Sequence, residues 1–310
     1  MAAVAAVIGV TVAVAVTRPS AYHQPEPPVA PPPSPAPTAQ LQLYWRDGDG
    51  IGRSNVDGTD KVDPLIPLSV SPFLCGPAVD QSYVYWTTPD QAGKGGTLGR
   101  AKRDGTGVVD SFITTNPYPP GCIAVDGAHI YWTGYNIGTR LDTIGRANLD
   151  GTGVQESFIS GISGGCGLAV DATHLYWAQN GGVGRANLDG TGVSPDFIAG
   201  LGASSSPGPW CGVVVDGAHI YWGNHNGTIG RANLDGTDAN ESFITGPSMS
   251  SLLLLPCAVD NDYLYWALIS ANRPADPPSP WIGRARLDGT DVQAHFINVQ
   301  PDSGGCAIGR

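Results

Sequence analysis

The chain repeats one pattern six times, and a repeat of this length limits the possible folds more than any other feature. The pair Tyr-Trp recurs at intervals of 41 to 46 residues. Its copies begin at Tyr44, Tyr85, Tyr131, Tyr176, Tyr221 and Tyr265. Each copy continues through Gly-Arg and Asp-Gly-Thr to Phe-Ile, with Leu65 in place of Phe in the first, and reaches a cysteine. A period of this length is typical of repeated four-stranded units.

One copy, residues 164–200, shows how each unit folds. Residues 167–171, 174–178, 183–188 and 196–199 are short apolar or β-rich runs separated by turn residues, so we expect a strand in each. Four antiparallel strands per period are typical of one blade of a β-propeller. Six periods therefore predict an all-β, six-bladed β-propeller over residues 41–310.

The two ends of the repeat predict how the ring closes. The first copy starts at Leu41, already in the second strand of its blade, and the chain ends with an innermost strand that no Tyr-Trp follows. We therefore expect residues 305–309 to pair with the strand that begins at Leu41. This pairing would remove the exposed edges of an open sheet.

The spacing within the repeat separates fixed from variable connections. The interval from Arg to Asp is always four residues, from that Asp to Phe or Leu65 eight, and from Val-Asp to Tyr five. The interval from Trp to Arg varies from eight to eighteen residues, and from Phe to the next Val-Asp from thirteen to nineteen. In a four-stranded meander both variable connections lie on one face of the ring. Variable loops on a rigid scaffold are where binding sites occur most often.

These motifs resemble the low-density-lipoprotein-receptor class B repeat, called YWTD, over residues 41–310. The resemblance rests on Leu-Tyr-Trp followed by Ile-Gly-Arg-Ala-Asn-Leu-Asp-Gly-Thr, and it implies a six-bladed propeller. The Asp of the family motif is kept only as Asp47. The other copies carry Thr88, Gly134, Gln179, Asn224 and Leu268 there. The hydrogen bonds of that Asp are therefore lost or are made by the Val-Asp residues.

The resemblance implies a binding scaffold, although related six-bladed propellers include lactonases and other hydrolytic enzymes. A Pro-rich segment between an apolar N-terminus and a propeller also resembles the extracellular sensor half of bacterial receptor-type serine/threonine kinases. No kinase motif is present, so this second resemblance concerns architecture alone.

The N-terminal segments indicate export. Residues 1–17 are an apolar run that suits either a membrane anchor or a signal segment. Residues 18–40 are rich in proline and predict an extended linker. We expect an extracytoplasmic propeller, membrane-anchored or secreted. The net charge of -11 argues against nucleic acid as a partner, and membrane contact is expected through the N-terminal segment only.

The cysteines occur once per repeat, ahead of each innermost strand, at positions 75, 122, 166, 211, 257 and 306. Buried free thiols that fill small gaps are the favoured interpretation. Disulfides between neighbouring blades and a thiolate metal ring are the alternatives. Unequal spacing from Cys to the Val-Asp aspartate argues against the metal ring.

The candidate binding residues are aromatic or charged side chains in the variable connections that the repeat does not share. They are Tyr118, Tyr135, Arg140, Trp210, His225 and Trp281. Aromatic and Arg side chains often anchor interfaces. Residues 250–256 are expected to form an apolar loop on the same face, either plugging the channel or forming an exposed patch.

The sequence favours a binding or sensor function over catalysis. The repeated His, Arg and Asp residues are expected to be structural, and no catalytic residue, metal ligand or cofactor is assigned. The favoured partner is a protein, a peptide or a cell-envelope glycan. The alternatives are a lactonase- or lyase-type enzyme at the channel mouth, with a divalent cation in the channel, and an architectural module of a larger envelope protein.

Overall fold

The computed structural model describes residues 40–68, 75–90, 92–136, 138, 141–179, 181–201, 212–224, 226–246, 252–270, 281–299 and 305–309. These residues belong to the compact unit Ala39–Arg310. They form 24 strands and no helix. Accordingly, no helix long and apolar enough to cross a membrane occurs among them. The N-terminal segment 1–17 and nearly all of the linker 18–40 lie outside the described residues.

The strands form six four-stranded antiparallel sheets, the blades, here given from the innermost strand outward. Blade 1 contains β24 (Cys306–Gly309), β1 (Gln42–Asp47), β2 (Gly50–Asn55) and β3 (Val62–Pro67). Blade 2 contains β4 (Ala78–Val79), β5 (Tyr83–Pro89), β6 (Gly96–Lys102) and β7 (Val109–Thr115). Blade 3 contains β8 (Pro120–Val125), β9 (His129–Gly134), β10 (Leu141–Asn148) and β11 (Gln155–Ser163).

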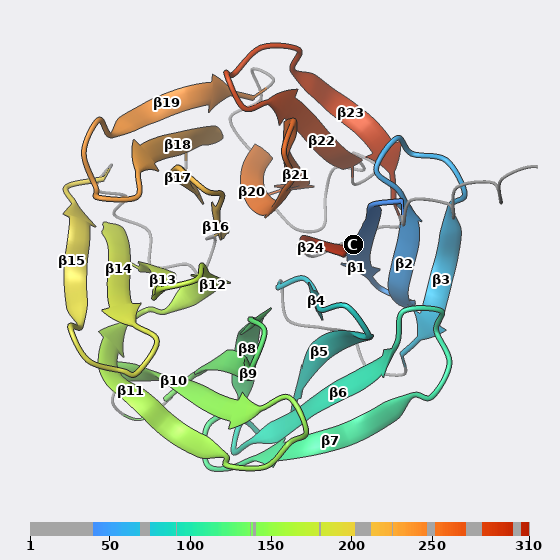
Figure 1. The fold of residues 1–310 in the computed structure, drawn as a ribbon, viewed down its shortest axis with the longest axis vertical. Coiled ribbons are helices and arrows are strands. Elements are labelled where there is room, and N and C mark those ends of the chain that lie inside the picture. Colours follow the sequence, from blue (N-terminus) through green and yellow to red (C-terminus); the bar gives the residue numbers. More distant parts are fainter. Residues whose placement is uncertain are drawn as a thin grey trace, which may run out of the picture. The chain divides into compact units, whose positions relative to one another are not determined.

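The other three blades follow the same order. Blade 4 contains β12 (Cys166–Val170), β13 (His174–Gln179), β14 (Gly182–Asn187) and β15 (Ser194–Ala199). Blade 5 contains β16 (Val213–Val215), β17 (His219–Gly223), β18 (Thr228–Asn233) and β19 (Asn240–Thr245). Blade 6 contains β20 (Leu252–Val259), β21 (Tyr263–Ser270), β22 (Trp281–Arg286) and β23 (Gln293–Asn298). Figure 1 shows the blades around a central axis, which confirms the predicted six-bladed propeller.

The C-terminal strand closes the ring as predicted. β24 pairs with β1, with Gln42 opposite Gly309 and Trp45 opposite Cys306. The backbone N–H of Arg46 extends this pairing by donating to the carbonyl of Gly305 at 3.3 Å. The first blade is therefore assembled from both ends of the repeat region.

The Tyr-Trp pairs fill the seams between blades. Successive side chains of a strand point to opposite faces, so Tyr and Trp of one pair enter different seams. Tyr131 of blade 3 packs in one core cluster with Trp177 of blade 4. Tyr265 of blade 6 packs in another with Trp45 of blade 1, across the closure. Because all six Tyr-Trp pairs are at most 3% exposed, these seams are the main hydrophobic core of the ring.

The Gly of each Gly-Arg motif makes room for the Trp of its own blade. A Cβ atom on Gly184 would lie 2.2 Å from Cε2 of Trp177. In the other five blades, a Cβ on the equivalent glycine would lie 2.2 to 2.5 Å from the nearest indole atom of the Trp in the same blade. A side chain at this position is therefore incompatible with the buried indole.

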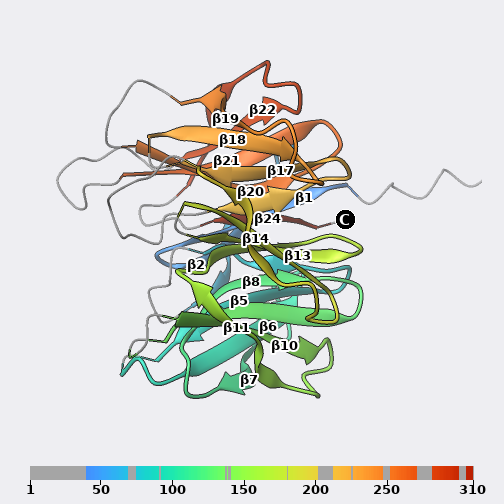
Figure 2. The same ribbon diagram turned by 90° about the vertical axis from the view of Figure 1, so that its left-hand side faces the viewer.

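The connections divide between two faces of the ring (Figure 2). One face, here the fixed-turn face, carries the turns from first to second and from third to fourth strands. The other, the variable-loop face, carries the hairpins from second to third strands and the links between blades. Residues 252–256, expected as an apolar loop, belong to strand β20, where Leu253, Leu254 and Leu255 are 1% to 5% exposed. The expectation of a loop was therefore wrong for these residues, because they pair with β21, and they form no exposed patch. Leu255 and Pro256 line the axial cavity.

Two disulfides join neighbouring blades, so the favoured interpretation of free thiols was wrong for four cysteines. Cys75 pairs with Cys122, with the Cα atoms 5.0 Å apart. Cys257 pairs with Cys306, with the Cα atoms 4.8 Å apart, and joins blade 6 to β24. Both separations lie in the usual range for disulfides. The side chain of Cys166 and all of Cys211 lie outside the described residues.

Candidate functional site

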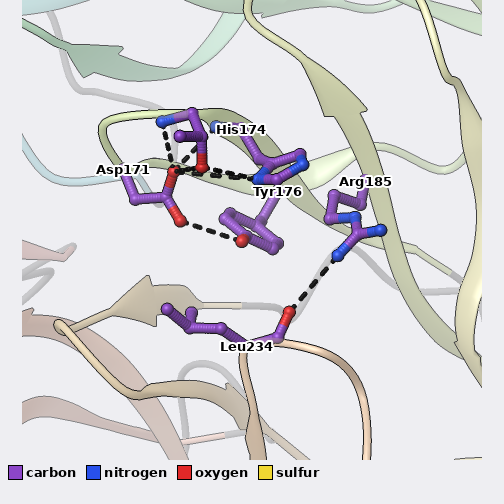
Figure 3. Close-up of polar contacts among 6 residues, drawn as sticks. Asp171, His174, Tyr176, Arg185 and Leu234 are labelled. Atoms are coloured by element: carbon purple, nitrogen blue, oxygen red, sulfur yellow. Dashed lines mark hydrogen bonds and ion pairs between the residues drawn. The ribbon is translucent and has the colours of Figure 1, made fainter.

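The Val-Asp aspartates hold the turns of the fixed-turn face (Figure 3). Oδ1 of Asp171 accepts the backbone N–H groups of Thr173 and His174, both at 2.7 Å. Oδ2 accepts the hydroxyl of Tyr176 at 2.9 Å. Four other blades repeat this arrangement, with Asp80, Asp126, Asp216 and Asp260. The repeated His residues take part through their backbone N–H groups, so this set is structural.

In blade 1 the tyrosine hydroxyl has a different acceptor, because Gly309 occupies the position of the Val-Asp aspartate in the other blades. The hydroxyl of Tyr44 donates instead to Oε1 of Gln42 at 2.8 Å. Nε of Arg103, from blade 2, donates to that hydroxyl at 3.2 Å. Arg103 replaces the Leu or Val found at this repeat position in the other blades. Arg103 therefore joins blade 2 to β1 of the first blade.

The Gly-Arg arginines join each blade to the next. Nη1 of Arg185 donates to the carbonyl of Leu234 in blade 5 at 3.3 Å (Figure 3). The guanidinium of Arg185 also lies 3.8 Å from the ring centre of Phe197. We call this arrangement the Arg clasp. The other pairs are Arg53 with Arg103, Arg100 with Leu149, Arg146 with Leu188, Arg231 with Leu287, and Arg284 with Val56. These arginines are therefore also structural.

The Asp-Gly-Thr turns place six aspartates on the fixed-turn face. The side chain of Asp150 accepts the backbone N–H of Thr152 at 2.9 Å and its hydroxyl at 2.6 Å. These hydrogen bonds lower the pKa of Asp150, and the same cause lowers the pKa of the aspartate in the other five turns. All six carboxylates are exposed and ionised at neutral pH, and each is held by its own turn.

The axial cavity is apolar. It has a volume of about 260 Å³ and is lined by the six innermost strands and the residues just before them. Its side chains come from Ala, Val, Ile, Leu, Pro and the two disulfides, and none carries a carboxylate, imidazole, amide or hydroxyl group. Among the described residues, no group of three His, Cys, Asp or Glu residues could hold a metal ion. The described wall of the cavity thus offers no acid–base group.

Three of the six candidate binding residues lie in the described part of the chain. Tyr118 and Tyr135 belong to blade 3, and Trp281 begins β22 in blade 6. In the ring of Figure 1, blades 3 and 6 lie opposite one another. The structure therefore brings the two tyrosines together but not Trp281. Arg140, Trp210 and His225 lie outside the described residues.

Tyr118, Tyr135 and Leu141 all lie at the variable-loop end of blade 3, and we call these three residues the blade 3 patch. The backbone N–H of Tyr135 donates to the carbonyl of Pro119 at 3.1 Å, which ties the β9–β10 hairpin to the β7–β8 link. Cβ of Tyr118 lies 3.0 Å from where a Cβ on Gly134 would be. Tyr135 is 45% exposed and Leu141 49% exposed. Leu141 was not among the predicted residues, because only its exposure in the folded chain distinguishes it from a core leucine.

A buried carboxylate supports this patch. Asp142 is 2% exposed and accepts the backbone N–H groups of Asn136 at 3.3 Å and Gly165 at 2.9 Å. It thereby joins the β9–β10 hairpin to the β11–β12 link. Burial raises the pKa of Asp142, and the two hydrogen bonds oppose that rise. A site resting on such a cross-link is fixed in position before a ligand arrives.

Trp281 is half-buried between blades 5 and 6. It packs against the core cluster of Tyr221 and Trp266. Its ring centre lies 5.0 Å from that of His295, an exposed residue of β23. No other blade has Trp or His at these two repeat positions. This pair forms a second, smaller aromatic surface.

Comparison with known proteins supports the fold. No family model matches the chain, and no curated protein matches it. A solved nidogen/laminin complex contains a similar chain, with a TM-score of 0.61 and 16% identity, over 86% of this chain and 98% of that one. A GH74 enzyme from Niastella koreensis is similar with a TM-score of 0.51 and 17% identity, over 73% of this chain and 37% of that one. At these identities the likeness is one of fold alone.

Proposed function

We propose that this chain is a non-enzymatic, extracytoplasmic binding or sensor propeller of the YWTD type. Its variable-loop face would contact a protein, a peptide or a cell-envelope glycan, and its N-terminal segment would tether it to the membrane. The two disulfides support an oxidising compartment, because such bonds persist mainly outside the cytoplasm. The similar chain in the nidogen/laminin complex comes from a structure of two proteins bound together, which fits a binding function.

The blade 3 patch is the observation that carries this proposal. The repeated Arg residues join neighbouring blades, and the repeated His and Asp residues hold the turns of their own blades. Tyr135 and Leu141, by contrast, expose apolar surface at positions that the repeat does not share. The other large hydrophobic side chains that are exposed in the described residues are valines. Exposed aromatic and aliphatic side chains on a rigid support are typical of interface anchors.

The test uses the full chain against a displayed peptide library and an array of cell-wall glycan fragments. Tyr135→Ser combined with Leu141→Ser is expected to weaken binding of the selected ligands about tenfold or more. Val154→Ser combined with Val193→Ser is the matched control, because these valines are 42% exposed on the fixed-turn face. The control is expected to bind within about twofold of the wild type. Equal weakening by both pairs, or no ligand from either source, would contradict the proposal.

The alternative of a lactonase- or lyase-type enzyme has less support. The similar GH74 protein is an enzyme, but the likeness is one of fold. The described wall of the axial cavity has no side chain that could act as an acid, a base or a metal ligand. A stoichiometric divalent cation in the purified chain, together with a calcium-dependent rise in melting temperature, would favour the enzyme.

A further inference from the structure

Arg46 breaks the repeat at a buried position near the ring closure. It follows Trp45 in β1, and its side chain is 2% exposed. The residues at this position in the other blades are small or neutral: Thr87, Thr133, Ala178, Gly223 and Ala267. Five blades thus fold without a charge here. The guanidinium is not required by the architecture of a blade.

The hydrogen bonds of Arg46 leave one edge of its guanidinium unused. Nη1 donates to the carbonyl of Thr87 in blade 2 at 2.7 Å. Nε is fully buried and has no acceptor. No carboxylate among the described residues forms an ion pair with Arg46. The Nε–Nη2 edge, which can bind a carboxylate through two parallel hydrogen bonds, is therefore unpaired.

An unpaired buried guanidinium is costly to the folded state. Taking a cation out of water is strongly unfavourable unless an anion or several acceptors replace the lost hydration. Burial lowers the pKa of Arg46 to about 10, which reflects this cost. Residues that oppose folding without local compensation tend to be functional. The missing partner of such a cation is an anion.

The position of Arg46 suits a ligand that arrives from the variable-loop face. Arg46 lies one residue before the end of β1, whose hairpin to β2 is on that face. Thr87 lies near the end of β5, which also leads into a hairpin there. Gly305, which accepts the backbone N–H of Arg46, lines the axial cavity. The guanidinium thus lies in the seam between blades 1 and 2, at the end of these blades that carries the variable loops.

We infer that Arg46 anchors a carboxylate-binding site in the seam between blades 1 and 2. The carboxylate would accept hydrogen bonds from Nε and Nη2, while Thr87 holds Nη1 in place. The carboxylate belongs either to a free small organic acid or to a Glu, an Asp or the C-terminus of a polypeptide. This site is separate from the blade 3 patch and is tested without knowledge of that patch's partner.

The experiment measures the melting temperature of the full chain in acetate, hexanoate and an acetylated, amidated Gly-Glu-Gly peptide. Chloride keeps the ionic strength equal, and acetamide, hexanamide and the Gly-Gln-Gly peptide are the neutral controls. A carboxylate is expected to raise the melting temperature with concentration, and its amide to have no effect. A shift with the free acids alone identifies a metabolite-type ligand, and a larger shift with the peptide identifies a polypeptide.

Two variants separate this site from a structural role of Arg46. Arg46→Met keeps the length of the side chain, and it is expected to weaken carboxylate binding about tenfold or more. Its own melting temperature should equal or exceed that of the wild type, because it removes an unpaired buried charge. Arg286→Met removes an exposed arginine from blade 6 and should leave carboxylate binding unchanged.

The opposite results would overturn the inference. If Arg46 only braces the seam, Arg46→Met melts at a lower temperature and carboxylates act on the wild type no more than their amides do. If Arg46→Met fails to fold, the melting-temperature shifts of the wild type with carboxylates and with their amides still test whether the protein binds a carboxylate. Equal carboxylate shifts in the wild type and Arg46→Met would place the anion elsewhere.

Discussion

The guanidinium of Arg284 donates a 3.3 Å hydrogen bond to the backbone carbonyl of Val56, 228 residues earlier in the chain. Arg284 lies in blade 6 and Val56 follows β2 in blade 1, so this bond joins the last blade to the first. The disulfide between Cys257 and Cys306 crosses the same junction. The closure therefore uses the same Arg clasp as the other five seams, and a disulfide reinforces it.

The Arg clasp makes a first prediction about stability. Arg185→Met removes the hydrogen bond to Leu234 and the contact with the ring of Phe197. A hydrogen bond from a charged donor and a cation–π contact together contribute about 2 to 3 kcal/mol. We expect the free energy of unfolding in urea to fall by about this amount. Arg185→Lys should recover only part of the loss, because an ammonium group lacks the planar guanidinium.

Blade 1 supplies the matched control for this prediction. Arg53 donates to the carbonyl of Arg103 at 3.3 Å, as in the other clasps, but Leu65 stands in place of the aromatic ring. Arg53→Met should therefore cost less than Arg185→Met, by about the 0.5 to 1 kcal/mol of a cation–π contact. Equal losses would show that the aromatic ring contributes nothing to the clasp.

The buried tyrosines predict a loss of stability at alkaline pH. Burial and the hydrogen bond to Asp171 raise the pKa of Tyr176 above its ordinary value of 10, and four other Tyr-Trp tyrosines shift the same way. A raised pKa means that the folded state holds the proton more tightly than the unfolded state. The stabilising contribution of these tyrosines is fully present below the tyrosine pKa of the unfolded chain. It is lost as the pH rises from that pKa through the higher pKa of the folded chain.

The measurement is the free energy of unfolding in urea between about pH 8 and pH 11. It should decline above about pH 10, and Tyr176→Phe should show a shallower decline than the wild type. At neutral pH the same variant should lose about 1 kcal/mol, because Oδ2 of Asp171 loses its donor. Identical declines in both proteins would show that Tyr176 ionises alike in the folded and unfolded chain.

The fold could be predicted from the sequence because the repeat specifies it redundantly. Each copy fixes its strands, its Asp-Gly-Thr turn and the Gly beneath Trp, and the incomplete copies at Leu41 and Cys306 fix the closure. Five of the Val-Asp residues, at a fixed spacing of five from the tyrosine, accept the hydroxyl of the adjacent Tyr-Trp tyrosine. These features are local or periodic, so they can be recognised in the amino-acid sequence.

The choice of disulfides over free thiols, and the place of Leu141 in the blade 3 patch, could not be predicted in the same way. The unequal spacing from Cys to the Val-Asp aspartate argues against a symmetric metal ring. It does not indicate whether cysteines of two neighbouring blades form a disulfide. Cys75 and Cys122 meet because their innermost strands converge on the axis, which the sequence does not show. Likewise, the exposure of Leu141 and the burial of Arg46 depend on what the next blade places against them.

The two disulfides make a prediction about the closure. They close loops of similar length, with sequence separations of 47 and 49 residues. Loss of either bond by a double Cys→Ser change should therefore cost about 2 to 4 kcal/mol. The local effects should differ. Cys257→Ser with Cys306→Ser frees a strand of four residues, β24, that is otherwise held mainly by its pairing with β1.

Hydrogen exchange followed by mass spectrometry checks this difference. Peptides that contain β24 and β1 should exchange faster in Cys257→Ser with Cys306→Ser than in the wild type. They should be unchanged in Cys75→Ser with Cys122→Ser, which is the matched control. Equal protection of β24 in all three proteins would show that strand pairing alone holds the closure. Peptide mapping without reduction would also show whether Cys166 and Cys211 are free or disulfide-bonded.

The last prediction concerns two glycines that look alike in sequence. Gly184→Ala would place a Cβ 2.2 Å from Cε2 of Trp177, a ring that is fully buried and cannot move aside. We expect a loss of about 3 kcal/mol or more, at the upper end of the cost of overpacking a core. Gly217→Ala is the control, because a Cβ there meets nothing within 4 Å, and blade 4 already has Ala172 at the same turn position. It should change the free energy of unfolding by less than about 0.5 kcal/mol. If Gly184→Ala were as well tolerated as Gly217→Ala, the Trp side chain would not be fixed in its seam, and the explanation of the Gly-Arg motif as space for the indole would be wrong.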